Sequence, residues 1–171
     1  ERLEKFHLPI LSDEVFSDFS FDDDARRVST LAGAASTLTF SMSGLSKIAG
    51  LPQMKLGWIV AGGPGHEAAL EGLEWIADTF LSVSTPIQLA LPRMLDAAAH
   101  VQSQILARAK ANQASLREAI AEGSPCHLLN VEGGWYAVLQ VPRTRCEEAW
   151  CLYLLEEHDV LVQPGFFYDF E

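Results

Sequence analysis

The most informative stretch of the sequence is residues 43–58, which read Ser43-Gly44-Leu45-Ser46-Lys47-Ile48-Ala49-Gly50-Leu51-Pro52-Gln53-Met54-Lys55-Leu56-Gly57-Trp58. It follows residues 37–42 (Thr-Leu-Thr-Phe-Ser-Met), whose apolar and β-branched composition predicts a strand. Lys47 therefore lies just past the end of a strand, among small and hydroxyl-bearing side chains that leave room for a phosphate. An amine in such a place can form a Schiff base with an aldehyde. Lys55 adds a second cation that can neutralise the phosphate.

A second chemical signal lies upstream of this stretch. Residues 8–12 (Leu-Pro-Ile-Leu-Ser) predict a buried strand, and Asp13 follows directly at its end. A buried carboxylate is costly unless a positive group pairs with it, and a protonated pyridine nitrogen would be such a partner. By spacing alone, both residues also have ordinary interpretations, namely a solvated surface lysine and an aspartate that caps a turn.

The remaining periodicity alternates between strands and helices. Residues 56–61 predict a third strand, and helical spacing of apolar residues follows over 66–80 and 84–120. The last part of the chain predicts three strands and one helix, at 126–131, 135–141, 160–162 and 145–158. Such units predict an α/β fold, with a large part over residues 1–105 and a small α/β or α+β part over residues 106–171.

Composition excludes several classes of protein. The net charge of −11 disfavours nucleic acid as a partner, and no apolar run reaches the roughly 20 residues that span a membrane. Three cysteines without a CxxC pair indicate a reducing compartment, so we expect a cytoplasmic protein. The five histidines lack metal-ligand spacing, and the acidic run Asp22-Asp23-Asp24 is typical of a solvated loop.

The order of these segments resembles the class I/II aminotransferases, which are fold-type I pyridoxal-phosphate-dependent enzymes. The lysine stretch at 43–58 resembles the family's lysine motif, and residues 11–16 (Leu-Ser-Asp-Glu-Val-Phe) resemble its acid-bearing strand. Residues 133–136 and 160–165 resemble strands of the family's small domain. The resemblance implies the C-terminal part of the large domain, a mostly parallel sheet with helices, followed by an incomplete small α+β domain.

The resemblance also implies roles for individual residues. Lys47 would bind pyridoxal 5'-phosphate covalently as a Schiff base and then move the proton of the substrate. Asp13 would pair with the pyridinium nitrogen of the cofactor. Lys55 falls where the family usually has a phosphate-binding arginine, and Ser46 would lie near the phosphate.

Three positions depart from the family's pattern. Phe16 stands where many relatives have a tyrosine that donates a hydrogen bond to the cofactor, and phenylalanine cannot donate. Lys55 replaces a bidentate guanidinium with a point charge. Gly44 stands where a phosphate-binding serine is common, and Ser43 is the candidate to serve instead. Trp135 and Tyr136 are candidates either for facing the substrate or for packing in the core.

The function implied is transfer of an amino group between an amino acid and a 2-oxo acid. A pyridoxal-phosphate-dependent β-lyase or decarboxylase of the same fold, and a non-catalytic truncated module, stay open as alternatives. We expect this chain to be a fragment that is inactive alone, because the family's N-terminal half and its substrate-binding arginine lie outside it. The full-length protein is expected to be a homodimer.

Overall fold

The computed structural model describes residues 4–6, 8–33, 36–80, 82–120 and 123–170. The chain forms two compact units, which are described separately. The first contains residues 1–110 together with 132–135, and the second contains residues 111–131 together with 136–171. The division into a large part at 1–105 and a small part at 106–171 stays a prediction.

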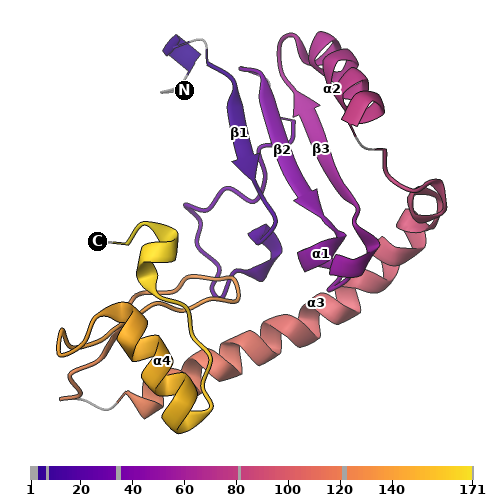
Figure 1. Cartoon of the computed structure of the whole chain (residues 1–171). Coiled ribbons are helices and arrows are strands. Elements are labelled where there is room, and N and C mark those ends of the chain that lie inside the picture. The colour runs from indigo at the N-terminus through magenta and orange to yellow at the C-terminus, as the bar shows by residue number, and fades with distance from the viewer. Residues whose placement is uncertain (1–3, 7, 34–35, 81, 121–122, 171) are drawn as a thin grey trace. The chain divides into compact units, whose positions relative to one another are not determined.

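The first unit is organised around a three-stranded sheet in the order β1-β2-β3 (Figure 1). The strands are β1 (Ile10–Asp13), β2 (Thr39–Gly44) and β3 (Gly57–Gly62). β1 and β2 run parallel, whereas β2 and β3 run antiparallel. The strands predicted at 37–42 and 56–61 are therefore confirmed within two residues, and the central strand is the one that precedes the lysine stretch.

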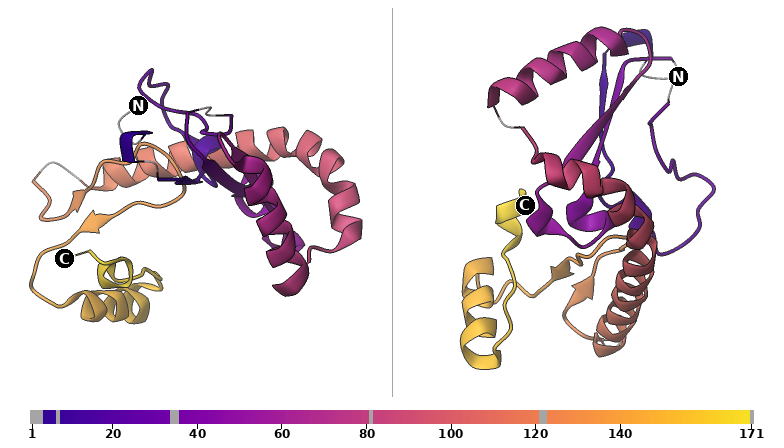
Figure 2. Two further views of the ribbon diagram at one scale, coloured as in Figure 1. Left: turned by 90° about the horizontal axis from the view of Figure 1, so that it is seen from above. Right: turned by 90° about the vertical axis from the view of Figure 1, so that its right-hand side faces the viewer.

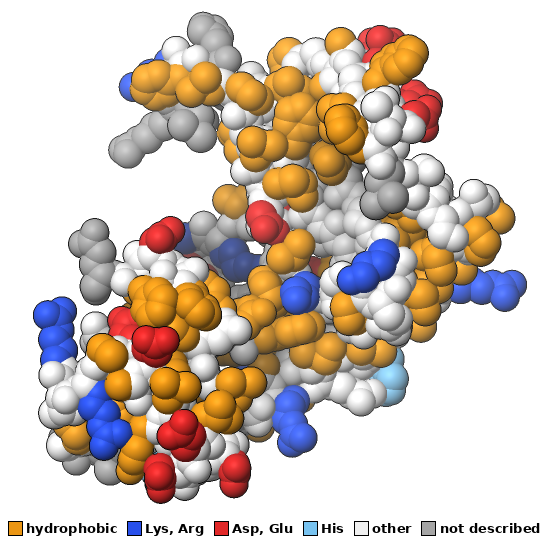
Figure 3. All heavy atoms as spheres, viewed as in Figure 1, with side chains coloured by type: hydrophobic (Ala, Val, Ile, Leu, Met, Phe, Trp, Pro, Cys, Tyr) orange, Lys and Arg blue, Asp and Glu red, His pale blue; other side chains and the backbone are white. Residues whose placement is uncertain are grey.

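β1 corrects one expectation from the sequence. The run at 8–12 predicts a buried strand, yet alternate residues of β1 are exposed and Leu11 is 71% exposed. Asp13 is likewise exposed, so the argument that burial forces it to find a positive partner is wrong. The physical reason is that no described element covers the face of β1 that carries these two side chains. Figure 3 shows hydrophobic side chains on the viewed face of this part of the molecule.

The lysine stretch forms a tight connection between β2 and β3. Its elements are the short helix α1 (Leu45–Ile48) and the 3-10 turn η3 (Pro52–Met54). Leu45, Ala49 and Leu56 are buried against Ala98 and form the core of the first unit, with partly buried Trp58 packed against it. Leu45 is fully buried two residues before Lys47, so packing anchors the turn that carries the lysine.

Two helices follow β3, as predicted. α2 (His66–Phe80) has no buried residue, and its apolar side chains Trp75 and Phe80 are 77% and 80% exposed. α3 (Thr85–Ala119) is a single helix with Pro92 inside it. Figure 2 shows it as one long helix. Ala98 is its only buried residue in the described part, where α3 packs against the lysine turn.

The end of β2 is held close to the start of β3 by a pair of glycines. Gly44 is aligned with Gly57, and a Cβ atom added to Gly44 would lie 3.0 Å from both the Gly57 Cα and the Leu56 carbonyl oxygen. The next residue, Leu45, donates its N–H to that same carbonyl at 3.0 Å. A side chain on Gly44 would therefore need these backbone atoms to give way by a few tenths of an ångström, which disfavours a serine at this position.

The second unit contains a two-stranded antiparallel sheet and one main helix. β4 (His127–Leu128) pairs with β5 (Leu139–Gln140), and α4 (Glu147–His158) is followed by the 3-10 turn η4 (Gly165–Tyr168). The predicted helix is confirmed. The strands predicted at 126–131 and 135–141 shrink to two residues each, and the one at 160–162 is wrong, because its backbone there pairs with no described strand.

The glycine pair gives a test of the fold. Gly44→Ala should lower the free energy of unfolding by about 1–3 kcal/mol, because its Cβ meets backbone atoms that cannot move aside independently. Gly72→Ala is the matched control, since Gly72 lies in α2 and has no atom within 4 Å of its added Cβ. It should raise stability by up to about 1 kcal/mol through helix propensity. Denaturant melts of both variants measure this, and equal stability of the two would contradict the packing argument.

Candidate active site

The predicted acid and lysine lie at the same end of two neighbouring parallel strands. Asp13 ends β1 and is aligned with Met42 of β2, and β2 continues to Gly44 before α1 presents Lys47. Carboxyl ends of parallel strands lie at one edge of a sheet. The sheet therefore brings to one edge two residues that are separated by 34 positions in the sequence.

Asp13 has one oxygen committed and one without a partner. Its Oδ1 accepts the backbone N–H of Val15 at 3.1 Å, which is the turn-capping role expected of an aspartate at a strand end. Its Oδ2 has no hydrogen-bond partner among the described residues. The carboxylate is thus oriented by the turn while one oxygen can still accept from a ligand.

Lys47 is surrounded by aromatic rings. Its Nζ lies 5.2 Å from the centroid of the Trp135 ring and 5.7 Å from that of Phe16. Both distances fall within the range of cation–π attraction. In the part of the chain that the structure describes, the ion pair found is that of Arg26 with Asp24, so no carboxylate pairs with the Lys47 amine there.

Trp135 reaches this place through a backbone contact between distant segments. Residues 132–134 run beside residues 19–21, with hydrogen bonds from Phe21 N–H to the Glu132 carbonyl and from Gly134 N–H to the Phe19 carbonyl, both at 2.9 Å. A Cβ on Gly133 would come within 2.5 Å of the Phe19 carbonyl oxygen, so glycine is required at this approach. Trp135 follows immediately and is thereby placed beside the lysine.

The three aromatic side chains pack edge to face. The Trp135 ring lies 5.3 Å from that of Phe19 and 5.5 Å from that of Phe16, with interplanar angles of 74° and 78°. Phe19 is fully buried, whereas Trp135 is 37% exposed. Such T-shaped pairs add about 0.5–1.5 kcal/mol each beyond area burial. The cluster therefore has a buried anchor and an accessible rim, with Lys47 at the rim.

Glu14, the neighbour of Asp13, fixes the loop that follows β1. Its carboxylate accepts a hydrogen bond from the Thr30 hydroxyl at 2.7 Å and another from the Leu31 backbone N–H at 2.8 Å. Partial burial acts to raise the pKa of Glu14, but these hydrogen bonds outweigh it and leave the pKa lowered. The ionised carboxylate thus ties residues 30–31 to the end of the strand.

The remaining predicted residues are not gathered at this point. Ser43 follows Met42, the partner of Asp13, so strand alternation turns its side chain to the opposite face of the sheet. Its hydroxyl is nevertheless buried without a hydrogen-bond partner among the described residues. Ser46 is half-buried beside Lys47, and Lys55 is exposed in a left-handed conformation (φ 52°) just before buried Leu56.

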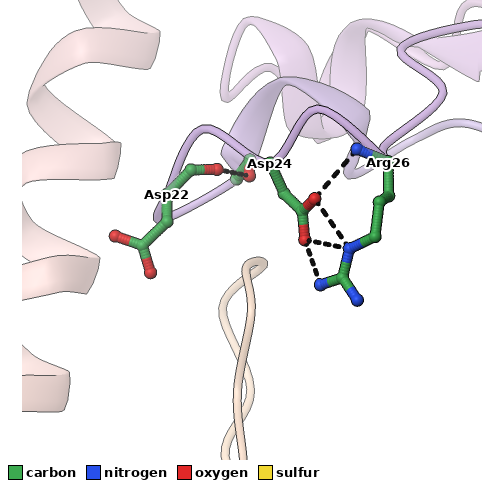
Figure 4. Close-up of polar contacts among 4 residues, drawn as sticks. Asp22, Asp24 and Arg26 are labelled. Carbon is green, nitrogen blue, oxygen red and sulfur yellow. Dashed lines mark hydrogen bonds and ion pairs between the residues drawn. The ribbon is translucent and has the colours of Figure 1, made fainter.

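The acidic run behaves as a solvated loop, as the sequence indicates. Asp24 forms an exposed ion pair with Arg26 at 2.5 Å and caps its backbone N–H at 2.9 Å (Figure 4). This hydrogen bonding lowers the pKa of Asp24. No cluster of three or more histidine, cysteine, aspartate and glutamate side chains suited to a metal ion occurs in the described ranges.

Comparison with known proteins supports the resemblance seen in the sequence. The family Aminotransferase class I and II matches residues 1–170. The chain belongs to this family. It is 34% identical over 91 residues to the glutamate-pyruvate aminotransferase AlaA of Escherichia coli and 28% identical over 104 residues to an alanine aminotransferase of Mycobacterium bovis. These matches cover 52% and 60% of the chain, but only 22% and 24% of the relatives.

Solved structures of aminotransferases share the fold. A methionine aminotransferase from Escherichia coli matches with a TM-score of 0.73 and 24% identity, over 94% of this chain and 42% of that one. An alanine aminotransferase from Pyrococcus furiosus matches with a TM-score of 0.74 and 17% identity, over 90% and 40%. The predicted α/β fold of the fold-type I enzymes is therefore confirmed. Among the described helices of this aminotransferase chain, none is long and apolar enough to cross a membrane.

Two contacts at this edge of the sheet could not be inferred from the sequence, that of Glu14 with Thr30 and that of Trp135 with Lys47. Glu14 lies next to Asp13, but no spacing rule connects it with Thr30. Trp135 was identified as a candidate without any link to Lys47. The paired glycines at 133–134 were the available signal, because adjacent glycines often mark close approach of two backbones.

The Glu14 contacts predict a pH-dependent loss of stability. Because the folded-state pKa of Glu14 is lowered from the ordinary glutamate value of 4.5, its contribution to stability is present above pH 4.5 and disappears as the pH falls through the folded-state pKa. Glu14→Gln should cost about 1 kcal/mol at pH 7, and the difference from wild type should shrink as the pH falls below 4.5. Thermal melts across pH measure this, with Asp23→Asn, at another exposed acid of the loop, as the control. A pH-independent difference would contradict the assignment.

Proposed function

We propose that this protein is an aminotransferase that uses pyridoxal 5'-phosphate to move an amino group between an amino acid and a 2-oxo acid. The observation that carries the proposal is the placement of Asp13 and Lys47 at the ends of adjacent parallel strands in a chain of this family. Each residue alone has an ordinary explanation. Their placement at one sheet edge, with an amine and a carboxylate oxygen that have no polar partner among the described residues, favours a shared ligand.

The side chains at this edge fit the proposed cofactor. Among the described residues the Lys47 amine has no carboxylate partner, and such an amine suits an aldehyde. One oxygen of Asp13 accepts no hydrogen bond there, and such a carboxylate suits a protonated ring nitrogen. When bound, pyridoxal phosphate supplies an electron sink for the substrate's Cα–H electrons. Lys47 would hold the cofactor and carry the proton, while Asp13 would keep the ring nitrogen charged.

The phosphate end of the site is less complete in this chain. Lys55 is exposed and supplies a positive charge within the connection that carries Lys47. Ser46 lies beside Lys47, and the buried hydroxyl of Ser43 is unpartnered among the described residues. We assign Lys55 and Ser46 to the phosphate side, and Ser43 to the same region from the face opposite Asp13. The Phe16 ring lies 5.7 Å from the Lys47 amine, and a phenyl side chain has no hydrogen-bond donor.

Relatives suggest which amino acids are involved. The curated relatives are named as alanine and glutamate-pyruvate aminotransferases, so small and acidic amino acids with their 2-oxo acids are the first substrates to assay. The proposal also includes a homodimer and a cytoplasmic location, both of which the sequence predicts. Since the chain spans less than half of its relatives' length, we assign this activity to the whole protein that contains it.

Covalent trapping tests the cofactor assignment. Pyridoxal phosphate at near-stoichiometric concentration, followed by borohydride, should label Lys47 in peptide maps. Lys47→Ala should abolish that label, while Lys110→Ala, at an exposed lysine of α3, should leave it intact. Label spread over the surface lysines with none on Lys47 would refute the proposal and favour a non-catalytic module.

The role of Asp13 predicts a specific loss of turnover. Asp13→Asn keeps the acceptor for the Val15 N–H but removes the negative charge, so the rate of amino-group transfer should fall about 10²-fold. Trapping of the cofactor on Lys47 should persist in this variant. Asp22→Asn, at an exposed acid of the loop, is the matched control and should retain wild-type turnover. Unchanged turnover in Asp13→Asn would contradict the pairing with the ring nitrogen.

A further inference from the structure

We propose that Trp135 is a positioning residue for Lys47, holding its amine by a cation–π contact at the sheet edge where the reaction takes place. The contact itself stands on geometry, and only its effect on turnover rests on the proposed function. No ion pair among the described residues holds the Lys47 amine. Two aromatic rings, those of Trp135 and Phe16, lie near its Nζ.

The exposure of Trp135 separates this role from simple core packing. A tryptophan that served only the core would be buried like Phe19, which is fully inaccessible, whereas Trp135 remains 37% exposed. Its ring lies closer to the amine than the Phe16 ring does, at 5.2 Å against 5.7 Å. Indole also presents the strongest quadrupole of the aromatic side chains to a cation. Trp135 is therefore the main contact and Phe16 the second wall.

The backbone around Trp135 is built to fix its place. Gly133 approaches Phe19 so closely that no side chain fits, and Gly134 adopts a left-handed conformation (φ 82°) directly before the tryptophan. The Gly134 N–H donates to the Phe19 carbonyl, the residue whose ring also packs edge to face with Trp135. Backbone and ring are thus secured to the same residue. A ring held this way restricts where the lysine amine can move.

The consequence for the proposed reaction is geometric. A lysine side chain has four rotatable bonds, and an amine that carries a proton has to return to the same place in each turnover. A displacement of about 1 Å at a reacting group can cost about 10²-fold in rate. A ring that limits the amine's positions should therefore raise kcat, with little effect on KM, because Trp135 acts through Lys47.

Amine reactivity in the full chain tests the contact without relying on the cofactor. The protein is treated briefly with acetic anhydride before pyridoxal phosphate is added, and acetylation of Lys47 is measured relative to Lys110 in the same molecule. Trp135→Leu should raise this ratio about two- to fivefold, since the amine is released from the ring. Trp135→Phe, which keeps an aromatic face, should stay within about twofold of wild type. Trp75→Leu, at a 77% exposed tryptophan of α2, is the control and should change nothing.

A folded Trp135→Leu protein with a wild-type acetylation ratio overturns the proposal. If that variant fails to fold by circular dichroism, Phe16→Leu takes its place, with a rise in the same ratio expected and no rise overturning the proposal. In the whole protein that contains this chain, with pyridoxal phosphate and substrates added, Trp135→Leu should lower kcat about tenfold at similar KM, with rescue by Trp135→Phe. A raised acetylation ratio together with no transamination by the wild-type whole protein would support the positioning role and refute the proposed function. Normal transamination by the wild-type whole protein, together with an unchanged acetylation ratio in Trp135→Leu, would refute the positioning role and support the proposed function.

Discussion

The contact between the end of β2 and the start of β3 fixes the backbone position of Lys47. Gly44 and Gly57 lie so close together that a Cβ on either would crowd backbone atoms at 3.0–3.1 Å, and Leu45 donates its N–H to the Leu56 carbonyl immediately afterwards. The chain can therefore leave the strand only as the short turn α1, whose buried Leu45 is locked into the core with Ala98. Lys47 follows two residues later, so its backbone position is set by close packing and hydrogen bonding with no contribution from its own side chain.

A second, longer-range contact completes the surroundings of that lysine. The segment at 132–134 pairs with residues 19–21 and is separated from them by more than a hundred residues in the sequence. Closing so long a loop costs entropy that local structure cannot offset. The two backbone hydrogen bonds and the edge-to-face rings of Phe19 and Trp135 are the interactions that oppose this cost. The lysine backbone thus depends on local packing, whereas its side chain depends on a contact between distant parts of the chain.

This difference explains what the sequence could and could not predict. The helices α2, α3 and α4 and the strands on either side of the lysine stretch follow from local sequence patterns. The strand predicted at 160–162 does not form. Its three apolar residues have the composition of a strand, but a strand also needs a partner strand in matching register. Burial of β1 failed for a related reason, since covering its Leu11 face requires another layer, which a local pattern cannot specify.

At the candidate site, the same limit separates the residues that were predicted from those that were missed. Asp13 and Lys47 could be predicted from the sequence because each lies beside a strand end within a recognisable motif. The aromatic contacts of Lys47 could not be predicted, because they depend on which segment pairs with residues 19–21. Ser43 shows that closeness in sequence can also mislead. It lies only four residues before Lys47, but strand alternation turns its side chain to the face of the sheet opposite Asp13.

The two consecutive acids at the end of β1 show how one strand can serve both the site and the fold. Glu14 donates its N–H to the Met42 carbonyl at 2.8 Å, so it extends the ladder by one residue beyond Asp13. Successive side chains in an extended chain point to opposite sides. Glu14 accordingly binds Thr30 and Leu31 and secures the loop, while Asp13 keeps one oxygen without a partner among the described residues. Because Glu14 holds the loop, Asp13 is not needed for that contact. Its carboxylate therefore stays available to a ligand at the edge of the sheet where Lys47 lies.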